Sequence, residues 1–178
     1  MAERSDSSLV EDALNGDGDS FTELCRRYYP AMVAIAHSIL GDRHLGEDAA
    51  QQTFANAVHK LPQLKNTNRF AYWLAAICRN VARDMTRTAE KLNTVQDLSM
   101  VAVESDQDEL TDVVRGAIGE LSVAARELVY LRYYDGMSYH QMSAVLGISE
   151  QAINGRLRRA KKKIAAYLRR NGIVEVRS

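Results

Sequence analysis

The chain has 178 residues, of which 46% are hydrophobic and 26% charged, and it contains only two prolines. This composition is typical of a helical globular protein, and the length allows one domain or two small ones. No window approaches eighteen consecutive apolar residues, and the N-terminus is polar and acidic, which excludes a transmembrane helix and a secretory signal. We therefore expect a cytoplasmic protein with no membrane insertion.

The formal net charge is zero, but the charges are distributed unevenly along the chain. Residues 1–92 carry a net charge of −1, residues 93–112 carry −6 with no basic side chain, and residues 113–178 carry +7. A basic C-terminal segment behind an acidic connector indicates that the partner of that segment is a polyanion.

Neither the cysteines nor the histidines have the spacing of a metal site. Cys25 and Cys78 belong to no CxxC pair, and each lies in an apolar helical pattern that predicts a buried free thiol. The four histidines lack zinc-ligand spacing. The sequence also contains no Gly-rich phosphate loop and no nucleophile–base set, so we expect no cofactor, no metal and no enzymatic activity.

Apolar residues recur at helical spacing through the first 40 residues. A capping box that starts at Ser8 predicts a short helix ending near Gly16. A second box that starts at Ser20 predicts a long helix ending at Leu40, with a kink or a break at Pro30.

The rest of the chain divides into helices and one acidic connector. Asp42 is a candidate N-cap for a helix over 44–61, a polar loop follows, and residues 70–88 form another helix. Four more helices are predicted over residues 110–121, 122–134, 138–146 and 149–170. The predicted fold class is all-α, with two small helical domains (residues 5–90 and 112–172) joined by a flexible acidic linker (residues 91–111).

The last two predicted helices have the pattern of a helix-turn-helix. Ser138 and Gln141 form a capping box for the first helix, Gly147 suits a tight turn, and Ser149 caps the second helix. Two helices joined by a short turn that contains glycine are the arrangement used to bind the DNA major groove.

The second of these helices carries eight basic side chains and one acidic side chain between residues 149 and 170. At about 100° per residue, one apolar stripe faces the preceding helices, and it consists of Ile153, Leu157, Ala160 and Ile164. On the outer face Asn154 could bond adenine and Arg158 guanine, while Lys161 to Lys163 are placed to hold phosphates. A merely solvated charged face is the alternative, but one-signed charge favours sequence-specific binding of duplex DNA.

The stretch LSVAARELVYLRYYDGMSYHQMSAVLGISEQAINGRLRRAKKKI resembles region four of bacterial sigma factors, especially the small extracytoplasmic-function (ECF) type. The stretches GDGDSFTELCRRYYPAMVAIAHSILGDRHLGEDAAQQTFANA and FAYWLAAICRNVARDMTR resemble the first part of region two and its promoter-reading helix. This resemblance covers nearly the whole chain in the correct order. It implies a subunit that binds core RNA polymerase, recognises the −10 and −35 promoter elements and promotes transcription initiation.

The resemblance also implies three sets of contact residues. The set expected to dock on the clamp coiled coil of the largest polymerase subunit is Glu47, Asp48 and Gln51. The set expected to hold the melted −10 element, with a base pocket and backbone cations, is Lys65, Asn66, Asn68, Arg69, Arg79, Asn80, Arg83 and Arg87. At the −35 element the resemblance implies Asn154, Gly155, Arg158 and Arg159. With further residues of the same helix and its cap, the set expected there is Ser149, Gln151, Asn154, Gly155, Arg156, Arg158, Arg159 and Lys162.

Several assignments keep an alternative. The positions of Glu47, Asp48 and Gln51 also fit a solvated face, with Ala50, Phe54 and Val58 turned inward. Trp73 could stack on a base, although a core position is favoured. Ala152, Asn154 and Gly155 depart from the family pattern, so the promoter sequence is not predicted. The resemblance further implies contact with the flap of the second polymerase subunit and control by an anti-sigma factor, although no residue identifies such a partner.

A second hypothesis is a stand-alone helix-turn-helix transcriptional regulator, whose N-terminal helices would dimerise or sense a signal. The region-two stretches argue against it. A repressor would also differ in behaviour, since it would bind its operator without polymerase.

Overall fold

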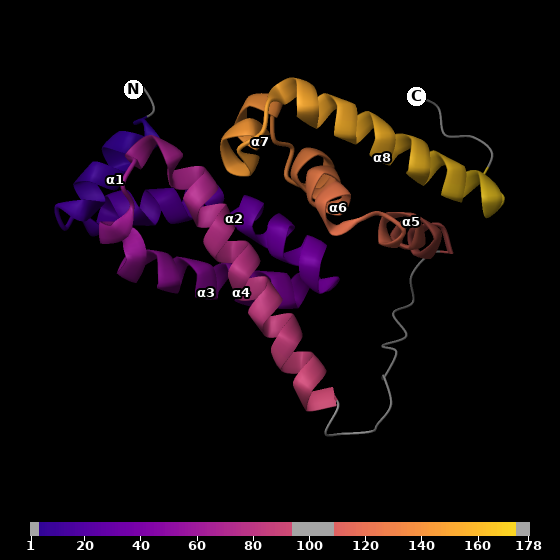
Figure 1. The fold of residues 1–178 in the computed structure, drawn as a ribbon, viewed down its shortest axis with the longest axis horizontal. Coiled ribbons are helices and arrows are strands. Elements are labelled where there is room, and N and C mark those ends of the chain that lie inside the picture. The colour runs from indigo at the N-terminus through magenta and orange to yellow at the C-terminus, as the bar shows by residue number, and fades with distance from the viewer. Residues whose placement is uncertain (1–3, 94–108, 174–178) are drawn as a thin grey trace.

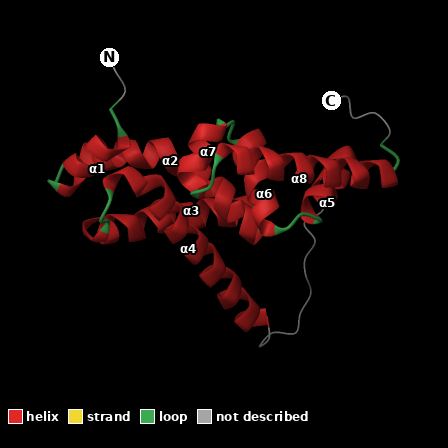
Figure 2. Ribbon diagram, turned by 45° about the horizontal axis from the view of Figure 1, so that its top comes forward, coloured by secondary structure: helices red, strands yellow, loops and turns green. Residues whose placement is uncertain are grey.

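The computed structural model describes residues 4–93 and 109–173, apart from the side chains of residues 92, 93 and 109. All regular structure in these two ranges is helical, which confirms the predicted all-α class (Figure 2). Within the same ranges, no helix is both long enough and apolar enough to cross a membrane. The predicted flexible linker falls mostly outside the described residues, while its ends at 91–93 and 109–111 continue the flanking helices.

Four α-helices form the N-terminal domain (Figure 1). They are α1 (Asp6–Leu14), α2 (Gly18–Leu40), α3 (Arg43–Lys60) and α4 (Phe70–Asn93), with the 3-10 turns η1 (Leu61–Gln63) and η2 (Thr67–Arg69) between α3 and α4. Every helix predicted from the sequence in this half is present, and α4 extends five residues beyond the predicted end.

Two predicted N-caps are wrong by about one turn. Ser5, not Ser8, caps α1, since its hydroxyl accepts a hydrogen bond from the Ser8 amide at 3.2 Å. Asp17, not Ser20, caps α2 and accepts a bond from the Asp19 amide at 3.1 Å. An oxygen-bearing side chain one turn earlier can serve as the cap equally well, so each helix gains a turn. The predicted Asp42 cap of α3 is confirmed.

Pro30 does not break α2, which is one helix from Gly18 to Leu40, so of the expected kink or break the break is absent. Pro30 itself is exposed, whereas each residue from 31 to 36 is buried. A proline inside a helix costs about 3 kcal/mol. Burial of six consecutive residues against the neighbouring helices outweighs that cost, since each large apolar side chain contributes about 1.5–3 kcal/mol.

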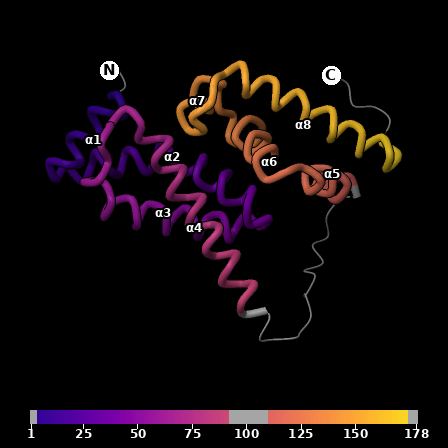
Figure 3. Tube along the Cα trace, in the orientation of Figure 1, coloured from indigo at the N-terminus to yellow at the C-terminus, as the bar shows by residue number. Residues whose placement is uncertain are grey.

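The C-terminal domain consists of α5 (Glu109–Gly119), α6 (Val123–Val129), the π-helical turn η3 (Tyr130–Tyr134), α7 (Tyr139–Leu146) and α8 (Glu150–Arg170). The predicted helix over 122–134 is therefore α-helical only in its first half. Helix α8 packs on α5, α6 and α7 and lies along the outer side of this domain (Figure 3).

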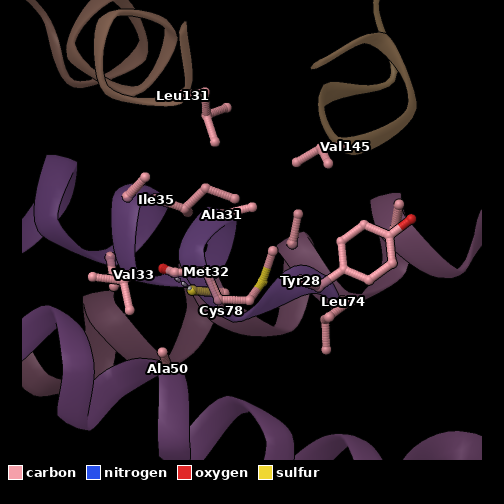
Figure 4. Close-up of a cluster of buried hydrophobic side chains, with 14 of the residues drawn as sticks. Tyr28, Ala31, Met32, Val33, Ile35, Ala50, Leu74, Cys78, Leu131 and Val145 are labelled. Carbon is pink, nitrogen blue, oxygen red and sulfur yellow. Dashed lines mark hydrogen bonds between the residues drawn. The ribbon is translucent and has the colours of Figure 1, made fainter. Parts of the chain in front are cut away.

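One continuous apolar core joins the two domains. Helix α6 and η3 pack against α2, and α7 packs against α4. Leu131 and Val145 of the C-terminal domain are fully buried, and their side chains point toward the α2 residues Ala31 and Tyr28 (Figure 4). This shared core fixes the orientation of the C-terminal domain on the N-terminal helices.

The two thiols are free, as expected, but only one is fully buried. Cys78 has no exposed surface, and its thiol donates a hydrogen bond to the Met32 carbonyl at 3.3 Å. Cys25 is half-buried, so the prediction of burial is correct for Cys78 and too strong for Cys25. Burial raises the pKa of each thiol to about 11, which keeps both in the unreactive protonated form at neutral pH.

Candidate nucleic-acid interface

The helix-turn-helix forms as the sequence predicts. The Ser138 hydroxyl accepts a bond from the Gln141 amide at 3.1 Å, and the Gln141 side chain accepts one from the Ser138 amide at 2.8 Å. Ser149 caps α8 by accepting a bond from the Ala152 amide at 3.2 Å. The turn between the helices is stabilised by the Ser143 hydroxyl, which donates to the Ile148 carbonyl at 2.7 Å. These local bonds fix the angle at which α8 is presented.

Helix α8 has the two faces expected from its spacing. Ile153, Leu157 and Ala160 are at most 2% exposed, and Ile164 packs against the same core. The residues of the −35 set lie away from that core: Gly155 is half-buried, and Ser149, Gln151, Asn154, Arg156, Arg158, Arg159 and Lys162 are exposed. The predicted outer face is therefore available to a ligand.

The structure adds a groove between α6 and α8 that the sequence did not indicate. It has a volume of about 300 Å³, and its lining combines apolar residues such as Leu128 with the basic residues Arg156, Arg159 and Lys163. Arg156 and Arg159 both belong to the set expected at the −35 element. In the fold both side chains reach this basic groove, which suits an anionic backbone better than a base edge.

Lys161 differs from the two lysines that follow it. Its ammonium lies 5.3 Å from the centre of the Tyr133 ring, and a hydrogen bond with the Tyr133 hydroxyl raises the pKa of Lys161. Of the three lysines expected to hold phosphates, one therefore contacts a side chain of its own domain.

The −10 set lies on two neighbouring elements of the N-terminal domain. Lys65, Asn66, Asn68 and Arg69 are exposed in and before η2, and Asn80, Arg83 and Arg87 are exposed on α4. The Asn66 side chain caps η2 by accepting a bond from the Asn68 amide at 3.0 Å. The Arg69 guanidinium lies 5.1 Å from the centre of the Tyr72 ring, and Arg87 pairs with Asp84. Loop and helix together present cations beside polar groups.

Trp73 belongs to the core side of this region. It is partly buried, packs against the apolar cluster and lies 5.8 Å from the Phe70 ring centre. The core alternative therefore describes its position better than a stacking platform does.

Arg79 is the member of the −10 set that does not face solvent. Its guanidinium forms a forked ion pair with Glu127 of α6, with Nη2–Oε1 at 2.6 Å and Nε–Oε1 at 3.1 Å. The two side chains are 18% and 9% exposed. Glu127 was not singled out from the sequence. Its position directly before Leu128, which is buried, could have indicated a buried charge that needs a partner.

The polymerase set lies on α3. Asp48 and Gln51 are exposed, whereas Glu47 is half-buried and pairs with Arg43 at 3.1 Å. Ala50 and Phe54 turn inward as predicted. The same prediction for Val58 is wrong, since that side chain is 46% exposed. Ala57 is buried instead. After Ala50 and Phe54, the next residue on the buried face of the helix comes three positions later and not four.

A groove of about 190 Å³ separates α2 and α3 from η3. The rings of His37 and Tyr130 stack across its edge, with centres 4.4 Å apart and planes 10° apart. Burial lowers the pKa of His37 and raises the pKa of Asp135 to about 6. Both groups are therefore held toward their neutral forms.

Comparison with known proteins identifies both domains. The model for sigma-70 region 2 matches residues 24–92, and the model for sigma-70 region 4 matches residues 111–164. The match over 24–92 sets aside the stand-alone regulator, because that hypothesis gave the N-terminal helices no role at polymerase.

Curated relatives match over nearly their full length. RNA polymerase sigma factor CnrH of Cupriavidus metallidurans is 30% identical, over 93% of this chain and 95% of CnrH. ECF RNA polymerase sigma factor SigM of Bacillus subtilis is 29% identical, over 83% of this chain and 94% of SigM. RNA polymerase sigma factor NccH of Alcaligenes xylosoxydans xylosoxydans is 28% identical, over 92% and 94% of the two chains.

The fold agrees with solved structures. CnrH in complex with the cytosolic domain of CnrY has a TM-score of 0.65 at 30% identity, over 94% of this chain and 99% of CnrH. The sigma factor RpoE of Bartonella quintana, in complex with the anti-sigma factor NepR, shares the fold with a TM-score of 0.58 at 24% identity, over 84% and 96% of the chains. Sigma factors bind core RNA polymerase and promoter DNA and are not enzymes. The chain belongs to the sigma-70 family of RNA polymerase sigma factors and is an ECF-type member that directs RNA polymerase to promoters.

Proposed function

We propose that α8 reads the −35 element as duplex DNA through its outer face. The observation that carries this proposal is that Asn154 and Arg158 are exposed while Ile153 and Leu157, beside them on the helix, are buried. An amide and a guanidinium so placed suit two-bond contacts with adenine and guanine, each worth about 1–3 kcal/mol of discrimination.

The other residues of the −35 set serve mainly to position the helix. Arg156 and Arg159, with Lys163, line the basic groove and are suited to one strand of phosphates. Lys162 would hold a further phosphate from the outer face. Ser149 caps α8 and Gln151 lies in its first turn, where the positive end of the helix dipole favours an approaching anion. Gly155 lets the backbone come close.

For the −10 element we propose single-stranded binding by η2 and α4. Lys65, Arg69, Arg83 and Arg87 supply cations for the strand, and Asn66, Asn68 and Asn80 supply hydrogen-bonding groups for a base turned out of the stack. Arg79 completes this set once it is released from Glu127.

For core polymerase we propose that Asp48 and Gln51, with Glu47 at their edge, bind the clamp coiled coil of the largest subunit. Their exposure on one face of α3, above the buried Ala50 and Phe54, supports this assignment. The C-terminal domain would contact the flap of the second subunit.

Region two would occupy residues 5–90 and region four residues 112–172, in a cytoplasmic protein. An anti-sigma factor is the proposed regulator, because the similar protein CnrH has been solved with the cytosolic domain of a second protein, CnrY.

Run-off transcription tests these surfaces together. Purified core polymerase is assayed with and without the protein on a library of promoter fragments, and binding to core is measured in parallel. A specific transcript that depends on the protein, lost on Arg158→Ala or Arg83→Ala, is expected. Tight binding to free duplex with neither core binding nor a transcript would contradict the proposal and favour a stand-alone regulator.

A further inference from the structure

An exposed tyrosine of the C-terminal domain holds a lysine of α8. Tyr133, in η3, is 51% exposed, and the centre of its ring lies 5.3 Å from the Lys161 ammonium nitrogen. The ammonium group also forms a hydrogen bond with the Tyr133 hydroxyl, which raises the pKa of Lys161. Both the face of a phenol ring and its oxygen attract a cation. Lys161 is therefore charged at neutral pH and held at a defined place on the surface.

The backbone that carries Tyr133 is itself held by hydrogen bonds. The Asp135 amide donates to the Tyr130 carbonyl at 3.1 Å, which closes the π-helical turn η3. The Met137 amide donates to the Leu131 carbonyl at 3.0 Å. Tyr130 and Leu131 are buried, so the start of the turn is anchored in the core. Turns of this kind are rare and occur frequently at functional sites. The turn thus presents Tyr133 to α8 in a fixed direction.

Lys161 lies on the same stripe of α8 as Asn154, the proposed reader of adenine. Lys161 follows Asn154 by seven residues, or two turns. The two positions are therefore about 20° apart around the helix and about 10 Å apart along it. The major groove of DNA is about 12 Å wide. With Asn154 at the base edges, Lys161 reaches the point where α8 leaves the groove and meets the sugar–phosphate backbone.

The charge of Lys161 is available to a phosphate at that point. Lys161 is exposed, and it forms no ion pair with another side chain in the described ranges 4–93 and 109–173. The Arg132 guanidinium lies close enough to act on Lys161 electrostatically, so the surface around the ammonium is positive. The Tyr133 hydroxyl accepts a bond from Lys161 and keeps its own hydrogen for donation. Two donors can therefore converge on one phosphate oxygen.

We propose that Tyr133 positions Lys161 and that the two side chains form a clamp for one phosphate of the −35 duplex, where α8 leaves the major groove. This inference rests on the proposed binding of that duplex by α8. It adds a residue that lies outside both helices of the helix-turn-helix. A phosphate contact fixes the depth and register of a helix in the groove without reading a base. The clamp therefore acts on every −35 sequence alike.

The pairing of the two side chains is tested in the protein without DNA. Trace labelling with acetic anhydride gives the reactivity of the Lys161 amine relative to that of Lys162, resolved by mass spectrometry. The reagent attacks the neutral amine, so a raised pKa slows labelling. Tyr133→Phe is expected to increase the Lys161-to-Lys162 ratio. Tyr134→Phe is the matched control and leaves the ratio unchanged, because Tyr134 is an exposed tyrosine of the same turn that packs on Tyr130.

The effect on DNA is measured by fluorescence anisotropy with the full-length proteins and the −35 duplex of the promoter found by run-off transcription. Lys161→Gln is expected to lower the affinity about tenfold and to reduce the slope of log affinity against log salt by about one. Tyr133→Phe keeps the cation, so it lowers the affinity about two- to tenfold and changes the slope by less than Lys161→Gln does. Tyr134→Phe is expected to bind as the wild type does. Circular dichroism checks that every variant is folded.

A scan with methylphosphonates locates the phosphate. Each phosphate of the duplex is replaced in turn by this neutral group, and the affinity of each protein is measured. In the wild type, one replacement is expected to remove the Lys161 contact, and that replacement costs less affinity in Lys161→Gln and in Tyr133→Phe. Lys162→Gln is expected to lose sensitivity at a different phosphate. A purely structural role of Tyr133 would lower the affinity without changing the sensitivity at any single phosphate.

The outcomes separate the clamp from the function on which it rests. An unchanged labelling ratio in Tyr133→Phe would overturn the pairing, and unchanged sensitivity at the phosphate assigned by Lys161→Gln would overturn the clamp. The proposed −35 function fails in a different way. In that case Arg158→Ala and Lys162→Gln bind the duplex as tightly as the wild type, and no neutral phosphate weakens binding.

Discussion

The ring of Tyr72 in α4 lies so close to Gly147, in the turn before α8, that a Cβ on Gly147 would come within 2.6 Å of the ring atom Cε2. Gly147 also has a φ of +68°, in the left-handed region. A single glycine therefore serves the turn of the helix-turn-helix and the contact between the domains. The cost of the positive φ can be separated from the cost of the contact with Tyr72 by comparing Gly147→Ala with an alanine substitution at a second glycine that has only the positive φ.

Gly147→Ala is expected to destabilise the protein more than Gly136→Ala does. Gly136 has the same φ of +68° but no atom within 4 Å of an added Cβ, so its substitution costs only the backbone term of about 1–2 kcal/mol. The clash with Tyr72 adds about 1–3 kcal/mol at Gly147. Denaturant unfolding of both variants measures the difference in their unfolding free energies. Equal midpoints would show that the Tyr72 side chain moves aside at no cost. Tyr72→Ala should remove most of the excess cost.

Gly155→Ala is expected to stabilise the free protein by about 0.5–1 kcal/mol. Gly155 lies inside α8 with ordinary helical geometry, and an added Cβ would meet only the Arg159 Nη1 atom at 3.8 Å. Alanine loses less backbone entropy than glycine on forming a helix. Thermal unfolding measures the gain. A loss of stability would contradict this expectation and show that the backbone at Gly155 requires glycine.

Arg158→Ala is expected to weaken binding to the −35 duplex by about 1–3 kcal/mol and to relax the preference at one base pair. Lys162→Ala should instead weaken all duplexes equally and reduce the slope of log affinity against log salt by about one. Fluorescence anisotropy over a salt series, with single-base variants of the site, measures both effects. Uniform weakening by Arg158→Ala would assign Arg158 to the phosphates.

Asp48→Ala is expected to weaken association with core polymerase by about 1 kcal/mol or more, because Asp48 is exposed at the centre of the proposed contact face of α3. Glu11→Ala is the control, since Glu11 is an exposed acid on α1, outside that face. Competition with a labelled wild-type protein for core polymerase gives the relative affinities. Equal affinity of all three proteins would remove Asp48 from the interface.

Asp135→Asn is expected to stabilise the protein at neutral pH and to change how stability depends on pH. Burial raises the pKa of Asp135 from 3.8 to about 6, so between these values the folded protein keeps a proton that the unfolded chain has lost. Stability from this group therefore falls as pH rises from about 4 to about 6.

The difference in unfolding free energy between Asp135→Asn and the wild type, measured from pH 4 to pH 8, isolates this effect. His37, Arg43 and Glu47 line the same groove, and His37 contributes in the opposite direction below its usual pKa. Because both proteins contain these three residues, their contributions largely cancel when the unfolding free energy of the wild type is subtracted from that of Asp135→Asn. A difference that stays constant across the range would show that Asp135 is hydrated in the folded protein.

Much of the helical structure followed from neighbouring residues alone. The Ser138–Gln141 capping box, the glycine turn and the buried stripe through Ile153 and Leu157 depend on groups no more than four residues apart. The errors at the helix starts were also local. Ser5 and Asp17 cap the first two helices in place of Ser8 and Ser20, which lie one turn later, since several neighbouring side chains can supply the same acceptor. The break expected at Pro30 does not occur, because the burial that compensates the proline comes from other helices.

The sequence by itself determined the two helical domains, the helix-turn-helix and the exposed face with Asn154 and Arg158. Only the tertiary structure decided that Arg79 meets Glu127 and that Arg156 shares a groove with Arg159. Helical spacing specifies which side of a helix is apolar, because that depends on a repeat of 3.6 residues. It does not specify which charge lies opposite when two domains pack, since that depends on contacts between residues 48 apart.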